Sequence, residues 1–191
     1  SEQHKQNFAI ASTASVSGTS IVIDSLRVEH ELGKLEAKGA LNTELGYPLD
    51  LDLSIDGKLD AANPIQTSLE LGGSLTELTL NAAVTQPIEA SLDAQLQPLS
   101  AERFLDAELN WQAFELATFI DTESLSDSKV AAGQLNISGD WQDYQVALNT
   151  QISTPQLPIA TTIDLSASVN ALYTNIEKLT LSILDGEIVS H

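Results

Sequence analysis

Apolar and polar residues alternate along most of this 191-residue chain. Between Leu49 and Leu59 every odd position except Gly57 is apolar, while the even positions carry Asp, Ser and Lys. Successive side chains of an extended strand point to opposite faces, so this period of two predicts a strand with one apolar and one charged face. The alternation recurs at 21–28, 69–75, 78–84, 88–96, 135–141, 144–152 and 157–169. The chain is therefore predicted to be all-β, with about a dozen strands.

Helical signals are few. Ser100 is a candidate cap for a turn that ends near residue 104, and residues 116–121 are predicted to form a second short helical turn. Residues 105–111 fit both periods, and we interpret them as a strand. The polar segment 122–129 is predicted to be a loop and the most mobile insertion in the chain.

Two patterns repeat within the chain. Ile23, Leu26, Val28, Gly33 and Leu35 correspond without a gap to Ile176, Leu179, Leu181, Gly186 and Ile188, each 153 residues later. A second pattern, apolar-x-apolar-x-Gly-x-apolar, is centred on Gly73 and Gly139, with variants at Gly39 and Gly57. Glycine permits a bulge or a tight turn between two strands. Repetition of such a unit favours one long sheet in which sequential strands are neighbours.

A sheet with a continuous aliphatic face and few helices to cover it has to fold over that face. We therefore predict a long curved sheet folded over an apolar interior, either closed around a dry core or open as an apolar groove. Aromatic residues make up only 5% of the chain, so short aliphatic side chains line the predicted interior. The candidate groove residues are Leu49, Leu51, Leu53, Ile55, Leu69, Leu71, Leu78, Leu80, Ile88, Leu92, Leu96, Leu135, Ile137, Val146, Leu148, Ile159, Ile163 and Leu165.

The net charge of −19 disfavours nucleic acid as a partner, because phosphate binding requires a basic surface. No catalytic or metal site is predicted. Cysteine is absent, and the three histidines, at positions 4, 30 and 191, form no cluster in the sequence. Asp52, Ser54 and Asp56 imitate the start of a calcium loop, but Asn63 stands where the bidentate Glu belongs. We expect no enzyme activity, no metal and no cofactor.

The segment GQLNISG at 133–139 and the closing Ile-x-x-Leu-x-Leu-x-x-x-x-Gly-x-Ile pattern from Ile176 resemble the repeat of the TamB proteins, in the AsmA-like superfamily. The chain contains no Met, even at position 1, so residues 1–191 are interpreted as one repetitive β-domain within a longer chain. The resemblance implies a taco-like form of the folded sheet, in a periplasmic segment of a Gram-negative protein anchored in the inner membrane. It also implies a link to a TamA-like outer-membrane barrel of the Omp85 type and to outer-membrane protein and autotransporter assembly.

Two functions follow as hypotheses. In the first, the groove shields the acyl chains of phospholipids and moves them between the inner and outer membranes. In the second, the chain is a strand-binding scaffold or chaperone that pairs outer-membrane protein clients through an exposed sheet edge.

Overall fold

The computed structural model describes residues 8–58, 63–101, 103–119, 127–140, 142–155, 157–170, 173–183 and 186–190, with the backbone alone at 157–159, 183 and 186–190. The strands are β1 (Ala9–Ser17), β2 (Ser20–His30), β3 (Gly33–Asn42), β4 (Leu49–Lys58), β5 (Pro64–Ser74), β6 (Glu77–Gln86), β7 (Ala90–Leu96), β8 (Phe104–Trp111), β9 (Phe114–Glu115), β10 (Lys129–Val130), β11 (Gly133–Asp140), β12 (Asp143–Thr154), β13 (Leu157–Asn170), β14 (Thr174–Ile183) and β15 (Gly186–Ser190). A 3-10 turn, η1, spans Leu116–Thr118.

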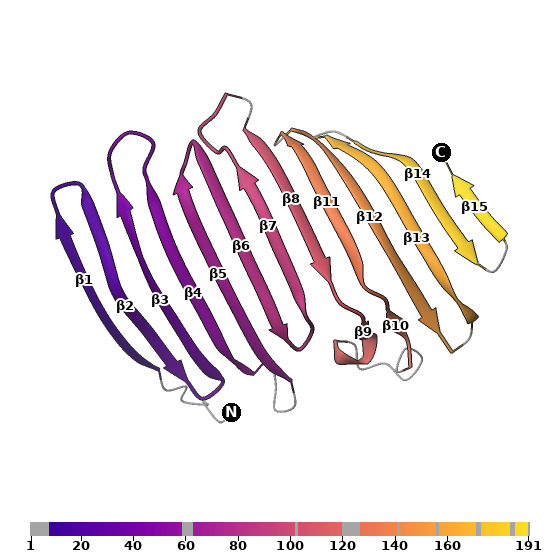
Figure 1. Cartoon of the computed structure of the whole chain (residues 1–191), viewed down its shortest axis with the longest axis horizontal. Coiled ribbons are helices and arrows are strands. Elements are labelled where there is room, and N and C mark those ends of the chain that lie inside the picture. Colours follow the sequence, from indigo (N-terminus) through magenta and orange to yellow (C-terminus); the bar gives the residue numbers. More distant parts are fainter. Residues whose placement is uncertain are drawn as a thin grey trace, which may run out of the picture.

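All the strands belong to one antiparallel sheet in which sequence neighbours are spatial neighbours, and only the short strands β9 and β10 lie off this path (Figure 1). β1 and β15 lie at opposite ends of the strand order. The all-β fold predicted from the period of two and the sequential strand order predicted from the repeats are both confirmed. Sequential pairing needs only hairpins, which form wherever a short polar turn separates two alternating segments.

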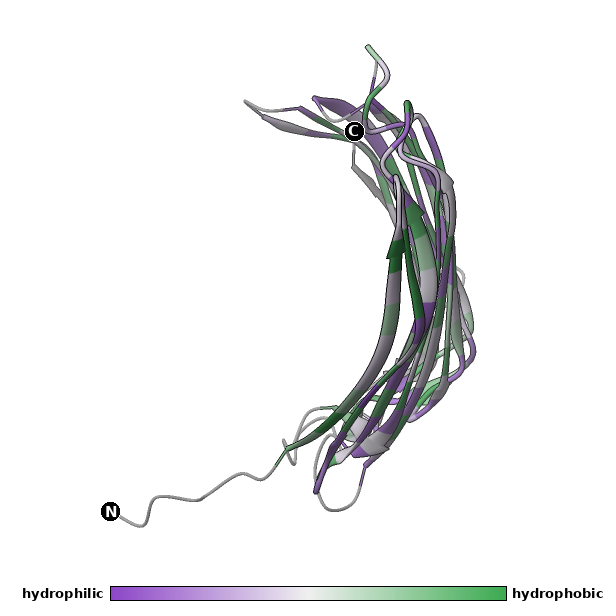
Figure 2. Ribbon diagram, turned by 90° about the vertical axis from the view of Figure 1, so that its left-hand side faces the viewer, coloured by the Kyte–Doolittle hydropathy of each residue, from purple (hydrophilic) through white to green (hydrophobic). Residues whose placement is uncertain are grey.

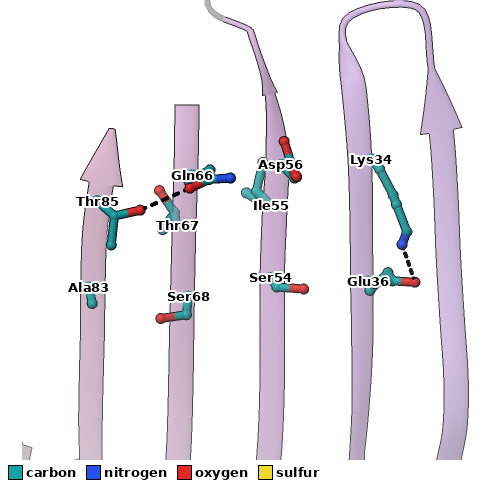
Figure 3. Close-up of a pocket in the computed structure, with 10 residues that line it drawn as sticks. All are labelled: Lys34, Glu36, Ser54, Ile55, Asp56, Gln66, Thr67, Ser68, Ala83 and Thr85. Atoms are coloured by element: carbon teal, nitrogen blue, oxygen red, sulfur yellow. Dashed lines mark hydrogen bonds and ion pairs between the residues drawn. The ribbon is translucent and has the colours of Figure 1, made fainter. Parts of the chain in front are cut away.

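The sheet is bowed along its strands, so that it has one concave and one convex face (Figure 2). The close-up of β3 to β6 views the same face of the sheet as Figure 1, and polar side chains such as Ser54 and Ser68 lie in front of the ribbon there (Figure 3). This face is the convex one in Figure 2. Side chains of alternate residues point to opposite faces of a strand. The aliphatic residues between those polar positions therefore line the concave face, as the taco-like prediction requires.

The internal repeat is larger in the structure than in the sequence pattern. In the β1–β2 ladder Thr13 pairs with Ser25 and Ala14 with Ile23, so Asp24 is the extra residue of a bulge. The β13–β14 ladder has the same bulge 153 residues later, at Glu177. Every residue pair of β1–β2 between Ala9 and Val16, and every pair of β2–β3 from Leu26 onward, recurs at this offset in β13–β14 and β14–β15. The three strands β1–β3 thus have a copy in β13–β15.

This bulge explains the spacing of the repeat. Ile23 and Leu26 are three residues apart, which in a regular strand places two side chains on opposite faces. The extra residue of the bulge shifts the alternation of side chains by one position, so Ile23 and Leu26 both lie on the concave face. The equivalent residues Ile176 and Leu179 also lie on this face.

The glycines at the centre of the repeated sequence pattern lie where the following strand approaches closely. Gly73 and Gly139 each precede a hairpin turn, and their own φ angles are positive, at 104° and 144° respectively. A side chain at either position would collide with the backbone of the next strand. Glycine is therefore required both by conformation and by space.

The structure differs from the predicted elements in a few places. Ile88 lies in a bend before β7, since Pro87 has no amide hydrogen with which to continue the ladder. Ser100 caps a turn, accepting a hydrogen bond from the amide of Arg103 at 2.8 Å, but Phe104 begins a strand. The turn predicted at 116–121 is η1, which is three residues long, and Ile120 and Asp121 lie outside the described residues.

In the predicted loop 122–129, residues 122–126 lie outside the described residues, and Lys129 is part of β10. Ser128, at 0% exposure, is fully buried. No helix within the described ranges has the length and apolarity needed to cross a membrane.

Candidate hydrophobic groove

Strand register aligns the concave residues of β4 to β13 into four rows that cross the sheet. The rows are named here after their members on β4. The Leu49 row holds Leu49, Gly73, Leu78, Leu96, Leu105, Gly139, Tyr144 and Val169; the Leu51 row holds Leu51, Leu71, Leu80, Ala94, Ala107, Ile137, Val146 and Ala167; the Leu53 row holds Leu53, Leu69, Ala82, Leu92, Leu109, Leu135, Leu148 and Leu165; the Ile55 row holds Ile55, Thr67, Val84, Ala90, Trp111 and Gly133, and resumes at Thr150 and Ile163. None of these residues is charged.

The rows form a continuous apolar band. Neighbouring strands lie about 4.8 Å apart, so the eight strands that carry these rows span about 34 Å, within a sheet whose thirteen-strand path spans about 60 Å. Residues on one face of a strand are about 7 Å apart, so four rows make a band about 20 Å wide. One leaflet of a membrane is about 15 Å of hydrocarbon, half the thickness of a bilayer core. The band therefore has room for extended acyl chains along its whole length.

No described layer covers this band. The chain exposes 12761 Å² of surface, whereas a compact monomer of its 20.4 kDa exposes about 8,800 Å². The only described hydrophobic residues that are buried are Ala37, Leu78, Val130 and Ala167, and none of these is below 5% exposure. A closed core of this chain length would bury many large aliphatic side chains completely. Of the two arrangements left open by the sequence, the described residues form the open one.

The structure brings together nearly all the candidate groove residues. Every one of them except Ile88 and Ile159 belongs to one of the four rows. Ile88 is the exception within the described residues, since it lies in the bend before β7, and the side chain of Ile159 lies outside the described part. Pattern reading omitted several members of the same band, such as Leu35, Val84, Leu109 and Leu179, although they show the same alternation.

Trp111 explains why the motif at 133–139 begins with glycine. A Cβ atom on Gly133 would lie 2.5 Å from the indole ring of Trp111, which therefore covers this glycine. The indole Nε1–H donates to the carbonyl oxygen of Ala131 at 3.0 Å. The ring thus fills the end of the Ile55 row while its polar edge is satisfied by the backbone.

A short fifth row extends the band at the same edge. β10 pairs with β9 and β12, which sets Phe114, Val130 and Ile152 side by side. Val130 is 7% exposed, and the ring of Phe119 meets Phe114 edge-on at a centroid distance of 5.7 Å. Strands of two residues carry too little periodicity for pattern analysis to detect this row.

The convex face is polar and acidic. A shallow hollow of about 320 Å³ on β3 to β6 has Lys34 bound to Glu36 at 2.6 Å and Thr85 bound to Gln66 at 3.3 Å (Figure 3). The proximity of Lys34 lowers the pKa of the Glu36 carboxyl through a hydrogen bond and charge attraction. These groups pair with one another in solvent, so the hollow has the character of a hydrated surface.

The convex residues offer no cluster for a metal. Asp52, Ser54 and Asp56 lie on one strand, where each is about 7 Å from the next along the backbone. This spacing does not allow their oxygens to surround one ion. Lys38 Nζ lies 3.0 Å from Asp52, and this carboxylate raises the pKa of Lys38. Within the described residues no three His, Cys, Asp or Glu side chains converge.

The comparison with protein families identifies the chain. No solved structure matches it. The family model described as TamB, N-terminal domain, matches residues 1–190. This match covers nearly the whole sequence and confirms the resemblance carried by residues 133–139 and by the closing pattern from Ile176. The chain therefore belongs to the TamB family, in the part described as its N-terminal domain.

Proposed function

We propose that the concave face of the sheet shields the acyl chains of phospholipids and offers them a path across the periplasm between the inner and outer membranes. The observation that supports this proposal is the band of four uncharged rows, three of which run without a gap from β4 to β13, with no described layer over it. Because the rows run across the strands, a chain can move along the band without meeting a charged side chain.

The free energy gained by burying an acyl chain on the concave face is of a size that suits a lipid carrier. Full burial of a methylene group gains about 0.8 kcal/mol, so an acyl chain of about fourteen methylenes gains about 11 kcal/mol on leaving water. A chain lying on an open face is covered on one side only and gains about half of that. This is large enough to hold a lipid in an aqueous compartment and small enough to release it to a bilayer.

The acidic convex face complements this role. Asp93 and Glu108 are directly opposite each other on neighbouring strands. Like charges in such pairs repel each other and an anionic membrane surface. In the whole protein this segment would act as part of a bridge that works with a TamA-like outer-membrane partner and supports outer-membrane protein assembly.

Photocrosslinking tests the proposal. A photoreactive amino acid is placed at Leu53, Leu92 or Ile163 on the concave face, and each position has a matched control one residue later, at Ser54, Asp93 or Asp164, on the convex face. The protein is incubated with vesicles of phosphatidylethanolamine and irradiated, and lipid adducts are identified by mass spectrometry. We expect adducts at the concave positions only. Absence of adducts at all three, or equal yields on both faces, would refute the proposal.

A further inference from the structure

The outer edge of β1 is an unpaired sheet edge among the described residues. All nine residues of β1 are exposed, with Ile10 at 69% and Val16 at 73%. No described residue pairs with this edge. Exposed edges are usually protected by Lys, by Pro or by a bulge. β1 contains no charged residue and no Pro, and the extra residue of the β1–β2 bulge belongs to β2, so β1 itself stays regular.

The internal copy of β1 shows what such an edge can hold. β13 repeats β1 at the offset of 153 residues, with the same pairs to the next strand. On its other side β13 is paired with β12. The equivalents of Ile10 and Val16 are Ile163 and Val169, and both are only partly exposed in β13. The position that β12 occupies beside β13 therefore has no described occupant beside β1.

We propose that the outer edge of β1 accepts one antiparallel strand whose side chains alternate as those of β12 do. Translating the β12–β13 register places the equivalent of Val146 opposite Ala14 and that of Ala147 opposite Thr13. Like β12, the guest strand carries mainly aliphatic or aromatic residues on the concave face and mainly uncharged polar residues on the convex face. It extends the apolar band by one strand.

The site selects for alternation and register more than for individual side chains. In the internal pair, Asn149 donates a hydrogen bond to Asp164, and Gln151 donates one to Thr162 at 3.0 Å. The β1 equivalents of these two partners are Ala11 and Ala9, which cannot accept such bonds. Recognition therefore rests on the backbone ladder and on the apolar face, which suits a range of amphipathic strands.

Disulfide trapping tests the register. The chain has no cysteine, so Thr13→Cys introduces a single thiol. The probe is a peptide with the sequence of residues 143–154 carrying Ala147→Cys, and the control peptide carries Leu148→Cys instead. A shift of one residue moves the thiol to the other face, so we expect at least about tenfold more disulfide with the first peptide. A protein control, Ser54→Cys, places the thiol on β4, which is paired on both sides, and we expect no trapping there.

Two results would overturn this proposal. Equal yields with the two peptides would show that capture has no register. Preferential formation of a disulfide dimer of the Thr13→Cys protein would show that a second copy occupies the edge. Hydrogen exchange on the unmodified protein supplies an independent measurement, because a bound strand slows exchange of β1 amides and leaves β4 unchanged. No slowing at saturating peptide would also overturn the proposal, and none of these readouts depends on lipid.

Discussion

Truncation of a groove leucine distinguishes an open apolar face from a closed core. Leu92 lies in the middle of the Leu53 row, between Ala82 of β6 and Leu109 of β8, and it is partly exposed. Leu92→Ala removes three carbons, which corresponds to about 2.4 kcal/mol for complete burial. Because Leu92 is partly exposed and no enclosed cavity forms, we expect a loss of about 1.5–2 kcal/mol.

The assay is urea unfolding followed by circular dichroism, with the free energy of unfolding extrapolated to water. Ser91→Ala, on the opposite face of the same strand, is the matched control and should change stability by less than about 0.5 kcal/mol. In a closed core, Leu→Ala costs about 3–5 kcal/mol because an empty cavity remains. A cost in that range for Leu92→Ala would refute our conclusion that this face is uncovered.

Four further predictions follow from individual contacts. Gly133→Ala would place a Cβ atom 2.5 Å from the Trp111 ring and should lower the unfolding free energy by about 2 kcal/mol or more. The control Gly72→Ala has its nearest contact at 3.7 Å and should lower it by about 1 kcal/mol or less in the same urea titration. Trp111→Phe loses the hydrogen bond to Ala131 and should lower the unfolding free energy by about 1 kcal/mol. In a Trp141→Phe background, brominated phospholipid should quench the fluorescence of Trp111, and unchanged emission would place the indole away from bound lipid. The amides of Asp143 and Gln142 donate to Asp140 at 2.8 and 2.7 Å and lower the pKa of its carboxyl. Asp140→Ala should therefore destabilise the hairpin at neutral pH. The difference in unfolding free energy between this variant and the unaltered chain should shrink as the pH falls below 3.8 and through the lowered pKa of Asp140.

The sequence by itself determined the strands and the face on which each side chain lies. Alternation is a local property, because each Cα–Cβ bond points opposite to that of the preceding residue in an extended chain. The candidate residues at 49–55 and at 135–148 could thus be assigned to one face before any pairing was known. The repeats of Gly73 and Gly139 also marked hairpins, since close approach of a following strand excludes a Cβ atom.

Tertiary structure decided the features that depend on distant residues. The pairing of β11 with β8 and the docking of Trp111 over Gly133 join segments separated by the excursion through β9 and β10, and no local pattern encodes that contact. The sequence pattern already matches β2–β3 to β14–β15, whereas the correspondence of β1 with β13 emerged only from matching registers, since β1 contains no leucine. Whether the apolar face is open or closed depends on the curvature summed over thirteen strands, whereas alternation within a strand is the same in both cases.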